Sequence, residues 1–101
     1  MNTDALVAHA RARFDHAAAR RVLKEKYEAK MLFAHAGGMW RADPELLVLL
    51  ATVPPGDAVI LDLYENPVQV RPEELRGLAM QRWQEQMNAW LVEHEQLNKK
   101  R

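Results

Sequence analysis

Residues 59–75 constrain the fold of this chain more than any other stretch, because a strand, a turn, a second strand and a helix start follow one another there. Residues 58–64 are rich in β-branched, aromatic and leucine side chains and predict the first strand. Residues 65–67, Glu-Asn-Pro, predict a tight turn before a returning strand at 68–70, because proline cannot donate to a ladder. Residues 71–74, Arg-Pro-Glu-Glu, predict the first turn of a helix.

The alternation along the first of these strands predicts which side of it is buried. Successive side chains of a strand point to opposite faces. The two faces consist of Val59, Leu61 and Leu63 on one side and of Ile60, Asp62 and Tyr64 on the other. One face is wholly apolar and the other is mixed, which is typical of a sheet covered on one side. We expect the apolar face to be the covered one.

The first thirty residues predict one long helix. Asp4 is a candidate N-cap, and helix-forming residues run from Ala5 to about Lys30. Apolar residues recur near helical spacing and comprise Leu6 or Val7, Ala10, Phe14, Ala17 or Ala18, Val22 and Tyr27. Because alanine makes up much of this stripe, the helix offers only a shallow surface for packing.

The residues after Lys30 admit two interpretations. Residues 31–35 lose the helical spacing, and Gly37-Gly38 separates them from a second short apolar run, which favours a β-hairpin. The alternative extends the first helix to His35 and ends it with Gly37 as a C-cap. We favour the hairpin.

Two further helices have clear start signals. Asp43-Pro44-Glu45 predicts a short helix from Pro44 to about Ala51, because aspartate caps free N–H groups and proline suits the first turn. The last helix is expected from Pro72 to about Asn98. Its apolar stripe comprises Met80, Trp83, Met87, Trp90, His94 and Leu97, beside Leu75, Leu78, Ala79 and Leu91. The whole chain, residues 1–101, is thus predicted to be a single α+β domain: long helix, hairpin, short helix, hairpin, long helix, with a small antiparallel sheet packed on the helices.

The lengths of the two long helices predict a projecting shape. A helix of about 27 residues is about 40 Å long, whereas a compact domain of about 100 residues has a radius of gyration of about 13 Å. One or both helices should therefore extend past the sheet. A projecting helix that carries apolar residues near its end must bury them against the first helix or against another chain.

Charge is balanced overall but unevenly distributed. The 101 residues include 14 basic and 14 acidic side chains. The first 30 residues hold seven basic and four acidic groups, whereas residues 31–70 hold one basic and five acidic groups. Basic helical ends thus flank an acidic centre, which suits self-association, an acidic partner or phosphate. The longest apolar run, residues 46–53, is too short to span a bilayer, so no membrane partner is expected.

Nothing in the sequence predicts catalysis. The chain has no cysteine and no serine, and its threonines are Thr3 and Thr52. Asp62 and Glu65 form a conceivable carboxylate pair, but acidic residues near a hairpin turn commonly serve local hydrogen bonding. The histidines, His9, His16, His35 and His94, lack the spacing of a zinc site. We expect no enzymatic activity, cofactor, metal or small-molecule substrate.

A partner protein or self-association is the function class that the sequence favours. Trp and Met are enriched at interfaces, and the free end of the last helix carries several apolar side chains. The predicted interface residues are Trp90, Leu91, His94 and Leu97, with Phe14 and Val22 as counterparts on the first helix. For Trp90, packing within the chain is an equally good interpretation.

Nucleic-acid binding and inhibition are the alternatives. Basic residues of the first helix and a tryptophan able to stack on a base give the candidate set Arg13, Arg20, Arg21, Lys24 and Trp40, with Lys99, Lys100 and Arg101 ending the chain. Zero net charge weakens this alternative, and a charged helix face is usually just solvated. Inhibition of a host or defence protein would instead use the acidic centre, with Asp62 and Glu65, as a mimic of nucleic acid.

Four stretches together resemble a family of short proteins found in large contractile-tailed, T-even-like bacteriophages. They are residues 29–40, 44–47, 61–68 and 87–95, followed by the basic ending at 99–101. The resemblance implies a phage setting, with a role in the virion, in its assembly or in host takeover, and hence a location in the host bacterial cytoplasm or in the particle. It supplies no catalytic residue, and the alanine- and arginine-rich first helix lies outside the pattern.

Overall fold

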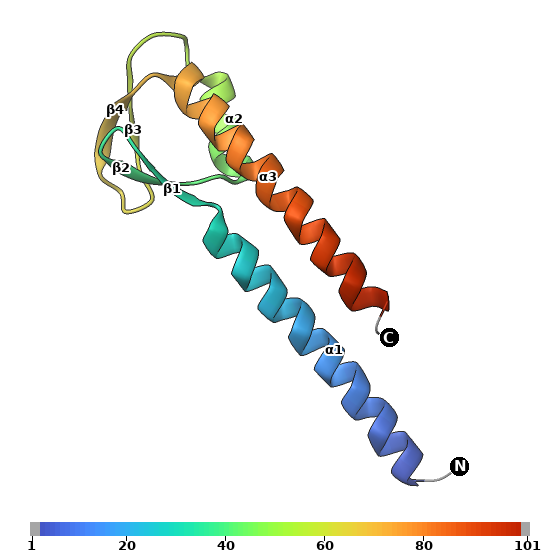
Figure 1. Ribbon diagram of the computed structural model, residues 1–101. Helices are drawn as coiled ribbons and strands as arrows, with labels where there is room; N and C mark the ends of the chain where they lie inside the picture. The colour runs from blue at the N-terminus through green and yellow to red at the C-terminus, as the bar shows by residue number, and fades with distance from the viewer. Residues whose placement is uncertain (1–2, 100–101) are drawn as a thin grey trace.

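A computed structural model describes residues 3–99 and has the predicted α+β architecture. Its elements, drawn in Figure 1, are α1 (Thr3–Lys30), β1 (Leu32–His35), β2 (Gly38–Arg41), α2 (Pro44–Thr52), β3 (Ala58–Leu61), β4 (Pro67–Val70) and α3 (Pro72–Lys99). The predicted hairpin after Lys30 is confirmed. Asp4 lies within the first turn of α1 instead of capping it, since the helix already includes Thr3.

The β1–β2 hairpin forms because a two-residue turn interrupts the chain at Ala36 and Gly37. Both residues have positive φ, 54° and 82°, as the tightest hairpin turns require. The strands pair antiparallel, with His35 opposite Gly38. Glycine is needed at position 37 for its backbone conformation and at position 38 for space, because a Cβ there would lie 3.1 Å from the Trp40 side chain.

The β3–β4 hairpin is a separate two-stranded sheet, and Asp62 joins it to the first one. One carboxylate oxygen, Oδ1, accepts from the backbone N–H groups of Tyr64 (3.0 Å) and Asn66 (2.9 Å), which shapes the turn. The other, Oδ2, accepts from the N–H of Met39 in β2 (3.1 Å), and the N–H of Leu63 donates to the Met39 carbonyl (2.8 Å). These N–H groups, led by that of Asn66, hold the pKa of Asp62 below its usual value.

Because Asp62 turns inward, the predicted orientation of β3 is wrong. The side chain of Asp62 is buried, and Ile60, two residues earlier on the same side, packs against the core. Val59 and Leu61 consequently point outward and are 66% and 60% exposed. The expectation that the wholly apolar face is covered fails because a buried carboxylate with several N–H donors determines the register more strongly than apolar area does.

The core lies where α2 and the start of α3 meet the two hairpins. Its buried centre comprises Trp40, Leu50, Val70 and Leu75, with Phe33, Leu46, Ile60 and Val68 packed against it. A second cluster of Met31, Ala42 and Ala79 continues this core along α3. The indole N–H of Trp40 donates to the His35 carbonyl at 2.9 Å, so the buried ring has its polar atom satisfied.

The helix starts follow the predicted capping chemistry. Asp43 has an extended backbone and its Oδ1 accepts from the N–H of Leu46 at 2.8 Å, with Pro44 in the first turn of α2. Pro67 is the first residue of β4, one position earlier than the predicted start of the returning strand, and a proline is tolerated there because it need not donate to the ladder.

Helices α1 and α3 run antiparallel and extend away from the hairpins as a two-helix arm (Figure 1). The molecule measures 67 × 24 × 21 Å and has a radius of gyration of 19.3 Å, well above the value of about 13 Å for a compact domain of this length. The predicted projection is confirmed. In Figure 1 the N-terminal end of α1 reaches beyond the C-terminal end of α3.

Two glycine substitutions test the close approach of the hairpins. Gly38→Ala is expected to lower the free energy of unfolding by about 1–3 kcal/mol, because the added methyl meets Trp40, Val68 and the Asp62 Cβ at 3.1–3.3 Å. Gly77→Ala is the matched control, because an added Cβ at this position of α3 meets no atom within 4 Å. It is expected to raise the free energy of unfolding by about 0.5–1 kcal/mol. Urea denaturation measures the free energy of unfolding of both variants. If the two substitutions change it by the same amount, the tight packing around position 38 is contradicted.

The Asp62 junction predicts a defined dependence of stability on pH. Asp62→Ala removes the acceptors for all three N–H groups and is expected to lower the melting temperature strongly at pH 7. Since the folded pKa lies below the unfolded value of about 3.9, the stabilisation is present above about pH 4 and is lost as pH falls through the folded pKa. The difference in melting temperature between wild type and variant should therefore shrink below pH 4. Asp57→Asn, at an exposed carboxylate, serves as control; a difference that does not shrink as the pH falls below 4 would refute the assignment.

Candidate interaction surfaces

The arm is held together by contacts between the C-terminal end of α1 and the distal half of α3. The rings of Tyr27 and Trp90 are stacked, with centroids 5.9 Å apart and planes at 6°. Beside them the Lys26 ammonium lies 2.8 and 3.0 Å from the Glu93 carboxylate oxygens. This ion pair lowers the pKa of Glu93 and raises that of Lys26, and a hydrogen bond to Glu93 raises the pKa of Tyr27. Trp90 is half-buried in this packing and belongs to the interior of the arm.

The other predicted α3 residues differ in their access to a partner. Leu91 is 55% exposed and available for contact. His94 is half-buried, with Nε2 3.2 Å from the Asn98 amide nitrogen. Leu97 is half-buried and lines a groove against α1. Of the four predicted α3 residues, Leu91 is thus the one that an incoming protein would meet most directly.

Phe14 and Val22 do not face α3 of their own chain, so they are not packed against the predicted α3 residues within the monomer, and their role at an interface with a partner stays a prediction. At about 100° per residue, each lies about 140° around α1 from Tyr27, whose ring contacts α3. Phe14 is 71% and Val22 62% exposed. The sequence pattern could not show which side of α1 faces α3, because alanine and other apolar residues occur on both sides of this helix.

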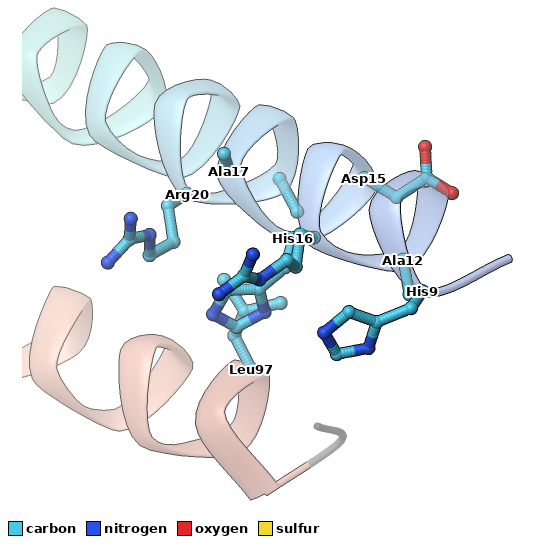
Figure 2. Close-up of a pocket in the computed structure, with 9 residues that line it drawn as sticks. His9, Ala12, Asp15, His16, Ala17, Arg20 and Leu97 are labelled. Carbon is cyan, nitrogen blue, oxygen red and sulfur yellow. The ribbon is translucent and has the colours of Figure 1, made fainter. Parts of the chain in front are cut away.

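The α3-facing side of distal α1 carries a basic groove instead. His9, Arg13, His16 and Arg20 recur at intervals of four, three and four residues, and with Leu97 they line an open groove of about 780 Å³. Figure 2 shows the rings of His9 and His16 and the side chain of Arg20 extending from α1 toward the end of α3, while Asp15 points away. The sequence placed both histidines on one helix face, but only the fold shows that α3 borders it.

The groove contains two of the predicted nucleic-acid residues, and the other candidates lie elsewhere. Arg13 and Arg20 line it. Lys24 is 3.6 Å from Glu28 on the outer surface, and Arg21 lies about 120° around the helix from Tyr27. Trp40 is 2% exposed, so it cannot stack on a base as expected. Lys100 and Arg101 lie outside the described residues.

The two acidic residues proposed to mimic nucleic acid, Asp62 and Glu65, are not both accessible. Asp62 is 9% exposed, and its carboxylate oxygens already accept from three backbone N–H groups. Glu65 is exposed in the turn, at a positive φ of 64°. The pair predicted for inhibition therefore presents one accessible carboxylate, because the other forms the junction between the hairpins.

A second exposed apolar surface, not anticipated from the sequence, lies on the β3–β4 hairpin. Val59 pairs across the sheet with Gln69, and Leu61 with Pro67; all four are exposed. Cross-strand partners point to the same side of a sheet, so these residues form one surface, here called the hairpin face. The signal in the sequence was Asp62 itself, whose need for N–H donors directs its own side of β3 inward.

Comparison with known proteins finds no matching family model, no matching curated protein and no matching solved structure. Across residues 3–99, no group of three metal-capable side chains converges. No helix in the same described range has the length and apolarity needed to cross a membrane.

Neighbouring residues on α3 test the internal role of Trp90. Trp90→Ala removes the stack on Tyr27 and is expected to lower the melting temperature by roughly 10 °C, because it deletes a large, half-buried aromatic ring and its stacking contact, together about 2 kcal/mol. Leu91→Ala, one residue on and largely exposed, should change it by less than about 3 °C. Circular dichroism at 222 nm measures both. If the two variants change the melting temperature by similar amounts, Trp90 does not contribute to the packing between α1 and α3.

Proposed function

We propose that this chain acts without catalysis, by protein–protein interaction through its two-helix arm. The supporting observation is the exposure of the N-terminal half of α1, where every residue from 3 to 15 is exposed to solvent. A helix in this position gains nothing from packing within its own chain, and isolated helical turns are marginal in water. Contact with another protein would supply the missing burial.

The side chains on this helix support a protein partner in particular. Val7, Phe14 and Val22 are at least half exposed and lie on the side of α1 turned away from α3. Several exposed apolar side chains along one side of a helix are more typical of an interface than a single one would be, and Phe14 is 71% exposed. Leu91 on α3 is exposed as well. Phe14, Val22 and Leu91 belong to the predicted interface set and are its exposed members, whereas Trp90 and Leu97 are half-buried between the helices.

The resemblance to short proteins of large contractile-tailed phages supports the biological setting of the proposal. In that setting the chain serves as a virion or assembly component, located in the host bacterial cytoplasm or in the particle. An elongated shape of 67 × 24 × 21 Å suits a connecting or assembling role.

Nucleic-acid binding is the second candidate, supported by the basic groove. Arg13 and Arg20 lie with His9 and His16 on one side of α1, where they can contact phosphate. The balanced net charge and the buried Trp40 weigh against it. A gel shift at low and moderate salt distinguishes nucleic-acid binding from protein–protein interaction. Binding through phosphate contacts should fall steeply as the salt concentration rises. It should also be lost when Arg13 and Arg20 are changed to glutamate.

Two exposed arm residues test the proposed function. Phe14→Asp and Leu91→Asp are expected to reduce association at least tenfold while the melting temperature stays within about 3 °C of wild type, because neither side chain is in the core. Association is measured by light scattering and by pull-down of particle components. Val48→Asp, at a 64% exposed position of α2, is the matched control and should bind as wild type does. If both arm variants also bind as wild type does, the arm is not the interface.

A further inference from the structure

The side of α1 turned away from α3 carries residues spaced alternately three and four apart. This set, here called the outer stripe, comprises Asp4, Val7, Arg11, Phe14, Ala18 and Arg21. At about 100° per residue, its members lie within an arc of about 100° that is centred opposite Tyr27, whose ring contacts α3. Every member except Ala18 is exposed, and Phe14 is 71% exposed. Such spacing is typical of the seam between two helices that pack along their length.

The charges of the outer stripe are complementary to those of the same stripe run in the opposite direction. When Asp4 is placed opposite Arg21 of a second, antiparallel copy, Arg21 in turn lies opposite Asp4 of that copy. In this register Arg11 lies beside Asp15 of the second copy, since Asp15 borders the stripe on the side of Asp4. The stripe thus mixes both signs of charge in an order that matches its own reverse.

The same register also brings the apolar members of the stripe together. Val7 lies opposite Ala18 of the second copy, where the small side chain allows the two helices to approach closely. Phe14 lies opposite Arg11, whose guanidinium can cover the face of the ring. Each contact occurs twice around the two-fold axis, so the exposed rings of both copies are covered.

Other pairings of two outer stripes bring like charges together. A parallel pair places Arg11 beside Arg11 and Arg21 beside Arg21, which repulsion opposes. An antiparallel pair shifted by one heptad toward the hairpins places Arg11 opposite Arg21 of the second copy. A shift in the other direction shortens the overlap to the stretch between Asp4 and Phe14. The register with Asp4 opposite Arg21 overlaps the helices over about 26 Å and leaves the hairpins outside the contact, because Thr3 then faces Val22.

We propose that the chain forms a two-fold dimer in which the outer stripes of two α1 helices pack antiparallel. This inference rests on the proposed function and names the partner of the arm as a second copy of the chain. Helix α3 of each copy lies on the far side of its α1, so the basic groove stays open in the dimer.

Disulfide cross-linking tests the direction and register of the pairing, because the chain has no cysteine of its own. Under mild oxidation, a mixture of Val7→Cys and Ala18→Cys should form a cross-linked dimer about tenfold faster than either variant alone. Two copies of position 7 lie about 16 Å apart along the axis of the antiparallel pair, so Val7→Cys should link poorly to itself. Val48→Cys, at an exposed position of α2, is the control and should link to neither variant. Rapid self-linking of Val7→Cys, or a mixture no faster than its components, would overturn the proposal.

A charge exchange tests the same register without cysteine. Arg11→Asp places a carboxylate beside Asp15 of the second copy at two symmetry-related positions and should weaken dimerisation about tenfold in sedimentation velocity. The double variant Arg11→Asp with Asp15→Arg restores opposite charges and should dimerise within about threefold of wild type. Arg76→Asp, the same substitution at an exposed position of α3, should leave dimerisation unchanged. A double variant as weak as the single one would refute the register.

These experiments separate the dimer from the proposed function. A wild-type protein that stays monomeric at millimolar concentration would overturn the dimer. If pull-down of a particle component still depends on Phe14 in that case, the arm binds a different protein and the proposed function stands. If neither dimerisation nor pull-down depends on Phe14 or Leu91, both the dimer and the proposed function fail.

Discussion

The carboxylate of Asp62 is the interaction on which the arrangement of the two hairpins depends. It accepts N–H groups from its own turn and from Met39, a residue 23 positions earlier in β2. Each hairpin alone is a two-stranded sheet, and such sheets are marginal in water. Asp62 connects the two sheets, and the close approach that results leaves little space for a side chain at position 38, where a Cβ would lie 3.1–3.3 Å from Trp40, Val68 and Asp62.

The same carboxylate determines what the outside of the molecule offers. Because its side chain must point inward to reach Met39, the residues on the other side of β3 face solvent, whatever their polarity. Val59 and Leu61 are exposed for that reason. A need for hydrogen bonding inside the fold thus creates an apolar surface outside it.

The arm follows from a second long-range contact. Tyr27 and Trp90 stack where α1 and α3 run side by side, and the Lys26–Glu93 ion pair lies next to them. This contact fixes the rotation of α1 about its own axis. It directs His9, Arg13, His16 and Arg20 toward α3 and leaves Phe14 and Val22 on the opposite side, so the basic and apolar sides of distal α1 are available to different partners.

The sequence by itself determined the helix that starts at Asp43-Pro44, the presence of two hairpins, the element order and two helices long enough to outreach the domain. It placed both turns too late in the chain, since the first lies at residues 36–37 and the second at residues 62–66. The features that it determined depend on caps, turn residues and helical periodicity, all of which act within a few residues. Only the tertiary structure decided which face of β3 is covered, that Trp40 is buried, and that Phe14 and Val22 turn away from α3. Those outcomes depend on the pairing of Asp62 with Met39 and of Tyr27 with Trp90, which bring together residues far apart in the chain. No local pattern contains that information, because an apolar side chain is equally compatible with a core and with an interface.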